Sequence, residues 1–145
     1  YMIINIRHTA IVVSNLKNSK SFYKGLGFSE YKEKKEVGTY IDKVTGIDNV
    51  TLKWAMLKSP DGSVLELLQY FSHPDVASSN SKNPPNRLGY SHIALTVDSS
   101  DSMCDRIITL GGKVINPPHA SNDGKVKVAY CYDNEGFLIE LVEEL

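Results

Sequence analysis

The chain has 145 residues, of which 41% are hydrophobic, and a formal net charge of −1. This composition is typical of a folded globular protein and gives no sign of disorder. The near-neutral charge, without a basic run, argues against a surface for nucleic acid or anionic membranes. No apolar stretch approaches the roughly 18 residues of a membrane span and no secretion leader is visible, so we expect a cytoplasmic protein.

A strand and a helix are predicted at the beginning of the chain. Residues 3–13 are rich in β-branched side chains and alternate in polarity, which predicts a strand. Ser14 and Asn15 can cap a helix, and the apolar residues that follow recur at helical spacing. Gly25 and Gly27 predict the end of this helix.

A second, short helix is predicted after a charged run at 30–36. Four apolar residues lie three or four positions apart and predict one side of this helix: Tyr40, Ile41, Val44 and Ile47. Gly46 is a plausible helix end. Two interpretations are open, because the helix could patch the core from the surface or act as a lid over a substrate pocket.

Two strands and a connector complete the first half of the chain. The strands are predicted at 52–57 and 64–71, with a Pro-Asp-Gly turn signal between them. Ser, Asn and Pro residues then become frequent, which predicts a connector at 72–88.

The second half predicts the same order of elements. A strand, a helix and three further strands are expected at 90–97, 98–110, 113–115, 126–132 and 137–142. His73 and His119 lie in loops beside prolines, and we expect surface positions for both, with His119 near the rim of a pocket. Cys104 and Cys131 lack a C-x-x-C spacing and are expected to be packed, reduced thiols.

The two halves are copies of one pattern. The segment around His8 matches the segment around His92 at an offset of 84 residues. Residues 60–67 match residues 134–141 at an offset of 74, so the first copy has a longer middle part. This repeat predicts two βαβββ modules.

Each copy carries one histidine on its first strand and one glutamate on its last. Strand alternation places these side chains on mostly apolar faces: His8, Glu66, His92 and Glu140. One interpretation is that the glutamates occupy solvent-facing positions that both copies inherited. The other is a shared site, since burying such groups is costly unless they are paired or bind a cation. Two imidazole nitrogens and two carboxylate oxygens suit a borderline divalent ion with open positions for water.

The repeated modules with these four residues resemble the vicinal oxygen chelate superfamily. That superfamily includes glyoxalase I, methylmalonyl-CoA epimerase, extradiol dioxygenases and bleomycin-resistance proteins, and residues 89–97 and 133–144 are most similar to glyoxalase I. The resemblance implies an α+β fold whose two βαβββ modules form a curled mixed sheet around a metal-centred cavity, with helices on the outer face. The implied single domain covers 1–145, with modules 1–71 and 89–145 joined by 72–88.

The resemblance implies that His8, Glu66, His92 and Glu140 bind one divalent ion, namely Ni, Co, Zn or Mn. Glu66 or Glu140 would also move a proton on a carbon next to a metal-chelated carbonyl of a small-molecule substrate, as in a lyase or isomerase. Epimerases usually have Gln at the position of Glu66, which favours a glyoxalase-like site. Bacterial glyoxalase I has a glutathione-binding Arg at the position of Val12, which argues against glutathione. The family also implies a homodimer.

Two alternative functions are kept. His8, His92 and Glu140 alone could form a two-His-one-carboxylate site for Fe(II) in an extradiol-type dioxygenase. Glu66 would crowd the open positions that such a site needs for oxygen. The other alternative is a metal-free binding or resistance protein that uses the same cavity.

Overall fold

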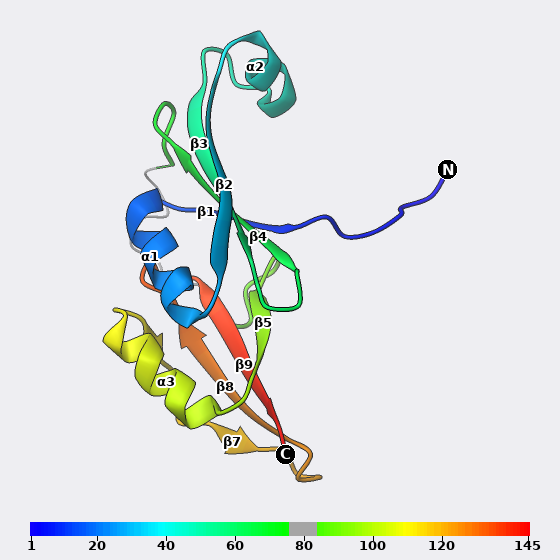
Figure 1. Cartoon of the computed structure of the whole chain (residues 1–145), viewed down its shortest axis with the longest axis vertical. Helices are drawn as coiled ribbons and strands as arrows, with labels where there is room; N and C mark the ends of the chain where they lie inside the picture. Colours follow the sequence, from blue (N-terminus) through cyan, green and yellow to red (C-terminus); the bar gives the residue numbers. More distant parts are fainter. Residues whose placement is uncertain (76–83) are drawn as a thin grey trace. The chain divides into compact units, whose positions relative to one another are not determined.

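The computed structural model describes residues 1–75 and 84–145 of the chain (Figure 1). The chain divides into two compact units, Tyr1–Ser79 and Asn80–Leu145. The described helices and strands confirm the α+β class, since each unit contains a mixed sheet and at least one helix. Residues 76–83 of the predicted connector lie outside the described residues.

The described part of unit 1 contains four strands and two helices. Their order is β1 (Thr9–Val12), α1 (Leu16–Leu26), β2 (Ser29–Val37), α2 (Thr39–Thr45), β3 (Thr51–Lys58) and β4 (Val64–Tyr70). The strands lie in the order β1-β4-β3-β2, with β1 and β4 parallel and the other neighbours antiparallel. The charged run at 30–36 therefore forms an edge strand, where charged side chains can face water.

The core of unit 1 lies between α1 and the centre of this sheet. Phe22 and Tyr23 on α1 are buried, as are Leu65 and Leu67 on β4. Asn15 caps the helix, because its side chain accepts a hydrogen bond from the backbone N–H of Asn18. The helix and its cap agree with the sequence prediction.

The strand predicted at 3–13 is shorter than expected. Only Thr9–Val12 pairs with β4, starting from Thr9 beside Leu65. The partner strand begins at Val64, so residues before His8 have no strand residue on β4 to pair with. Residues 1–7 are exposed.

Helix α2 corrects the prediction that its four apolar residues share one side. Ile41 packs in a small core with Val50 and Leu52, and Ile47 is packed against the same core. The side chains of Tyr40 and Val44 point outward, with exposed fractions of 73% and 64%. Tyr40 and Val44 are four residues apart and lie one above the other, whereas Ile47 follows the helix end and does not obey helical spacing.

Within residues 84–145, unit 2 contains one helix and five strands. Their order is β5 (His92–Val97), α3 (Ser100–Thr109), β6 (Lys113–Val114), β7 (His119–Ala120), β8 (Val126–Tyr132) and β9 (Leu138–Glu144). The main sheet has the order β5-β9-β8-β6, and β7 pairs with β8. Strand β7 was not predicted, and it places His119 in a strand beside Val128 instead of in a loop.

The core of unit 2 lies between α3 and one face of this sheet. Ile107 on α3 is buried, as are Ile139 and Leu141 on β9. Cys104 and Cys131 are also buried and free, with their sulfur atoms 3.9 Å apart. Burial raises the pKa of both thiols, that of Cys131 to about 12, as expected of packed, unreactive cysteines. No described helix is long and apolar enough to cross a membrane.

Candidate metal centre

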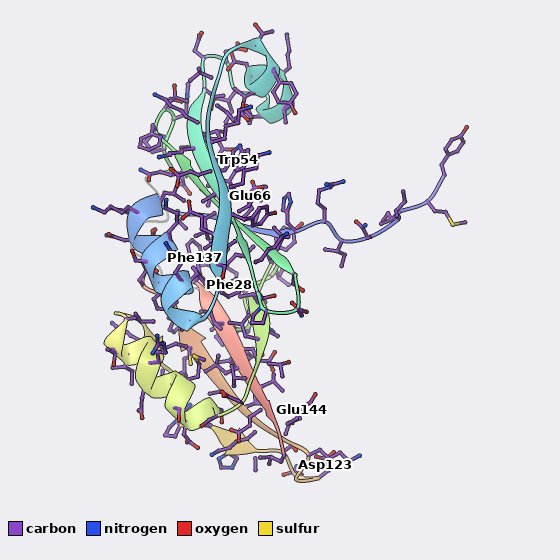
Figure 2. The ribbon with its side chains drawn as sticks, in the orientation of Figure 1. Phe28, Trp54, Glu66, Asp123, Phe137 and Glu144 are labelled. Carbon is purple, nitrogen blue, oxygen red and sulfur yellow. The ribbon has the colours of Figure 1, made fainter. Side chains whose placement is uncertain are left out.

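Unit 1 brings His8 and Glu66 together. His8 directly precedes β1, and Glu66 lies in the middle of β4 (Figure 2). The parallel pairing of β1 and β4 sets Ala10 beside Glu66, so the residue two positions earlier reaches the same face. The Nε2 atom of His8 is 3.4 Å from a carboxylate oxygen of Glu66.

The Glu66 side chain lies on the sheet face opposite the core residues Leu65 and Leu67. Nevertheless only 9% of the residue is exposed. This burial raises the pKa of the Glu66 carboxyl, and the positive charge that His8 can carry lowers it in part. An almost buried carboxylate beside an imidazole is a suitable ligand for a cation. The bound cation would replace the contacts with water that the carboxylate loses on burial.

Unit 2 brings His92 and Glu140 together in the same way. His92 is the first residue of β5, and Glu140 lies in the middle of β9, beside Ala94 of the parallel partner. The Nε2 atom of His92 is 2.9 Å from a carboxylate oxygen of Glu140. Both side chains are about one quarter exposed, at 25% and 24%, so the pair remains accessible to a ligand.

Two further residues, neither of them predicted from the sequence, contact His92. The Ser91 hydroxyl oxygen is 2.8 Å from His92 Nδ1. The Tyr130 ring lies edge-on to the His92 ring, with centroids 5.2 Å apart, and Tyr130 pairs across the strands with Glu140. In unit 1, Met56 occupies the place of Tyr130 beside Glu66. The offset of 74 residues in the repeat also relates these two positions.

The distances within the two pairs fit a shared cation. Two atoms bound about 2.1 Å from one ion lie about 3.0 Å apart at a right angle and about 3.4 Å apart at a tetrahedral angle. The two N···O distances, 3.4 Å in unit 1 and 2.9 Å in unit 2, agree with these values. In neither unit do the described residues add a third His, Cys, Asp or Glu side chain to the pair. That all four residues bind one ion therefore stays a prediction.

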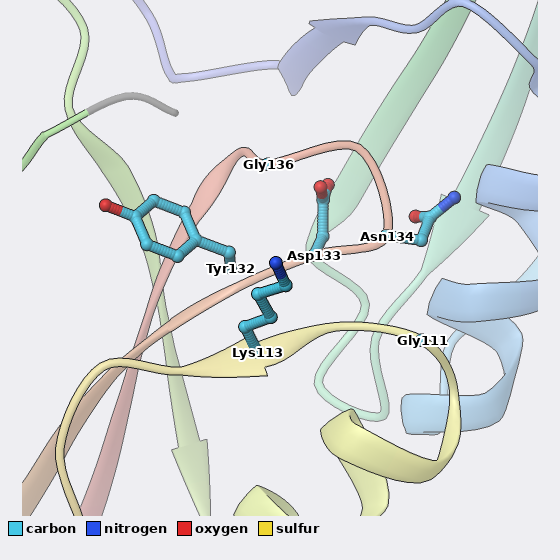
Figure 3. Close-up of a pocket in the computed structure, with 6 residues that line it drawn as sticks. All are labelled: Gly111, Lys113, Tyr132, Asp133, Asn134 and Gly136. Carbon is cyan, nitrogen blue, oxygen red and sulfur yellow. The ribbon is translucent and has the colours of Figure 1, made fainter. Parts of the chain in front are cut away.

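A small hollow lies at the end of the unit 2 sheet where β8 turns into β9. Its volume is about 150 Å³, and Figure 3 shows its lining residues: Gly111, Lys113, Tyr132, Asp133, Asn134 and Gly136. Tyr132 pairs with Leu138, which in turn pairs with His92, so the hollow lies in the same row of the sheet as that histidine. His92 and Glu140 themselves do not line it.

Comparisons with known proteins identify the family to which the chain belongs. The family model described as Glyoxalase/Bleomycin resistance protein/Dioxygenase superfamily matches residues 5–141. A probable lactoylglutathione lyase of Vibrio cholerae is 30% identical over 144 residues, which cover 95% of this chain and 89% of that protein. A probable lactoylglutathione lyase of Synechocystis is 40% identical over 55 residues, and this match spans only 38% of the chain and 42% of that relative.

A solved structure agrees with this assignment. A glyoxalase family protein from Bacillus cereus is 28% identical and superposes with a TM-score of 0.91, covering 100% of this chain and 97% of that one. The chain belongs to the Glyoxalase/Bleomycin resistance protein/Dioxygenase superfamily.

Proposed function

We propose that the chain is a metal-dependent lyase or isomerase of glyoxalase I or epimerase type. The observation that carries the proposal is the repeated His–Glu pair, His8 with Glu66 and His92 with Glu140, at distances suited to metal ligands. Two relatives named probable lactoylglutathione lyase support the same reaction type. One is matched over 89% of its length and the other over 42%.

The four side chains would hold one divalent ion, Ni, Co, Zn or Mn. When bound, such an ion stabilises the negative charge that develops on a carbonyl oxygen next to the reacting carbon. Glu66 or Glu140 would remove a proton from that carbon and return it, because a carboxylate can act as both base and acid. The two imidazoles would take no part in this proton transfer and would serve only as ligands of the ion.

One exposed side chain near the pairs supports a proposal for the substrate class. Val12 lies on the same sheet face as Glu66 and is 53% exposed, so it offers an apolar surface where glyoxalase I has a glutathione-binding Arg. We therefore propose a small 2-oxoaldehyde adduct or acyl thioester that does not depend on glutathione for recognition. We also propose a homodimer, which sedimentation velocity measures directly.

Metal content is the experiment that tests the proposed function. Protein purified without chelator is loaded with Ni, Co, Zn or Mn, dialysed and assayed by elemental analysis. We expect about one ion per chain, and we expect Glu66→Ala and Glu140→Ala each to lose it, because either substitution removes a ligand. Glu144→Ala is the matched control, because Glu144 lies on the same strand face as Glu140 but is exposed.

The other outcomes separate the alternatives. Uptake of Fe(II) alone, together with oxygen consumption in the presence of catechols, would replace the proposal with an extradiol-type dioxygenase. No retained metal under any loading condition would instead favour a metal-free binding protein. Equal metal loss in Glu144→Ala would show that the ion binds elsewhere.

A further inference from the structure

The His92 ring is held at both of its nitrogen atoms. Nε2 lies 2.9 Å from a Glu140 oxygen, and Nδ1 lies 2.8 Å from the Ser91 hydroxyl oxygen. Both distances are those of hydrogen bonds. The edge-on ring of Tyr130 restricts the remaining direction in which His92 could turn.

The chemistry of these partners assigns the proton on the ring. A neutral imidazole has one donor nitrogen and one acceptor nitrogen, and an ionised carboxylate only accepts. In the metal-free chain, Nε2–H therefore donates to Glu140. Nδ1 is then the acceptor, and the Ser91 hydroxyl donates to it.

Metal binding requires the opposite arrangement. Nε2 can bind a cation only through its lone pair, so the proton must move to Nδ1, and Nδ1–H then needs an acceptor. A hydroxyl oxygen can donate one hydrogen bond and accept others, so Ser91 satisfies His92 in both tautomers. A carbonyl oxygen or an ionised carboxylate would satisfy only the metal-binding tautomer.

We propose that Ser91 is a positioning residue that allows His92 to exchange tautomers without leaving its orientation when the metal binds. This inference rests on the proposed function, and it adds a residue that neither the repeat nor the family match assigns. The residue at the equivalent position of unit 1 is Arg7, which has no acceptor atom in its side chain. Among the described residues, no comparable hydrogen bond to Nδ1 of His8 is found.

Two measurements on Ser91→Ala test the role. The Zn²⁺ dissociation constant, measured by chelator competition, should rise about 10- to 100-fold, as is typical when the outer partner of a ligating histidine is lost. Ser91→Thr keeps the hydroxyl and should bind Zn²⁺ nearly as tightly as the unchanged chain. Thr96→Val removes a hydroxyl from the same face of β5 without touching His92, and it should leave the constant unchanged.

The second measurement reads the tautomer itself in protein with ¹⁵N-labelled histidine. The His92 resonances should show Nε2–H in the metal-free chain and Nδ1–H after Zn²⁺ is added. In metal-free Ser91→Ala, the Nδ1 resonance should shift, because its hydrogen bond from the hydroxyl is gone. An unchanged Zn²⁺ constant in Ser91→Ala, or Nδ1–H already present without metal, would overturn the role of Ser91.

The two proposals fail in different ways. If the unchanged chain retains none of Ni, Co, Zn or Mn, the proposed function fails. The metal-free spectra still decide the hydrogen bond, and an Nδ1 resonance unaffected by Ser91→Ala would overturn the Ser91 inference on its own.

Discussion

At the scale of single residues, Glu66 combines a charged side chain with an almost buried position. It lies between Leu65 and Leu67 on β4, and burial raises the pKa of its carboxyl above the ordinary value of 4.5. A raised pKa means that folding favours the neutral form. The carboxyl therefore favours folding at low pH, and this contribution is lost as the pH rises through its folded pKa.

We expect Glu66→Gln to stabilise the metal-free protein at neutral pH, because Gln stays uncharged. The gain in free energy of unfolding should be present at about pH 7.5 and should shrink toward about pH 4, where the glutamate itself is protonated. Urea unfolding with a chelator at both pH values measures it. Glu144→Gln is the exposed control and should show no such trend. A pH-independent difference for Glu66→Gln would contradict the desolvation of Glu66.

The orientation of His92 belongs to the same scale, because the proposed tautomer exchange requires that the ring stays in place. Ser91 and Tyr130 both restrain His92, whereas the described part of unit 1 gives His8 only Glu66. The two halves of the repeat thus differ in how firmly each histidine is oriented. The more firmly oriented histidine is His92 of unit 2, which contacts the Tyr130 ring.

At the scale of elements, the two sides of α2 bear on the two open interpretations of this helix, a patch on the core and a lid over a substrate pocket. Ile41 holds the helix on its small core, and Tyr40 presents its ring to solvent. The helix is therefore attached to the core through Ile41, and its outer side faces solvent.

Substitutions at Ile41 and Tyr40 should differ in their effect on the free energy of unfolding. Ile41→Ala should lower the free energy of unfolding by about 2–4 kcal/mol, because it empties a buried site. Tyr40→Ser should change it by no more than about 0.5 kcal/mol, as is usual for exposed residues. If α2 is a lid, Tyr40→Ser should raise the Michaelis constant while stability stays the same. An unchanged Michaelis constant would leave α2 a structural patch.

Most elements of the fold could be predicted from local pattern, and the exceptions have physical causes. Strand β8 at 126–132 was predicted with the bounds that the structure shows. Strand β7 has two residues beside prolines and exists only because β8 offers an open edge, which no local pattern contains. The strand at 3–13 was overestimated because its length is set by where β4 begins and not by its own composition.

At the scale of the whole molecule, the sequence predicts which residues form each His–Glu pair but not the residues around them. The repeat identified His8, Glu66, His92 and Glu140 as two related pairs, and each pair meets within its own unit. Ser91 and Tyr130 were missed because their contacts depend on rotamers and on cross-strand register. Whether the pairs meet at one ion depends on the arrangement of the units, which the chain's local patterns do not encode.

Trp54 provides a way to ask whether one ion links the two units. It is the only tryptophan in the sequence and lies on β3 of unit 1, on the same sheet face as Glu66 (Figure 2). Its half-buried ring, with its N–H 3.4 Å from a Glu36 oxygen, should report the unfolding of unit 1 through fluorescence. A metal bound by unit 1 alone would stabilise this transition whatever happens in unit 2.

We expect Zn²⁺ at about 100 times its dissociation constant to raise the free energy of unfolding seen by Trp54 by about 2.7 kcal/mol. Glu140→Ala, a substitution in unit 2, should abolish this gain, because a shared ion needs donors from both units. Glu144→Ala should keep it. If Trp54 still reports the full gain in Glu140→Ala, the His8–Glu66 pair binds metal on its own, and the four-residue site has to be replaced by two independent ones.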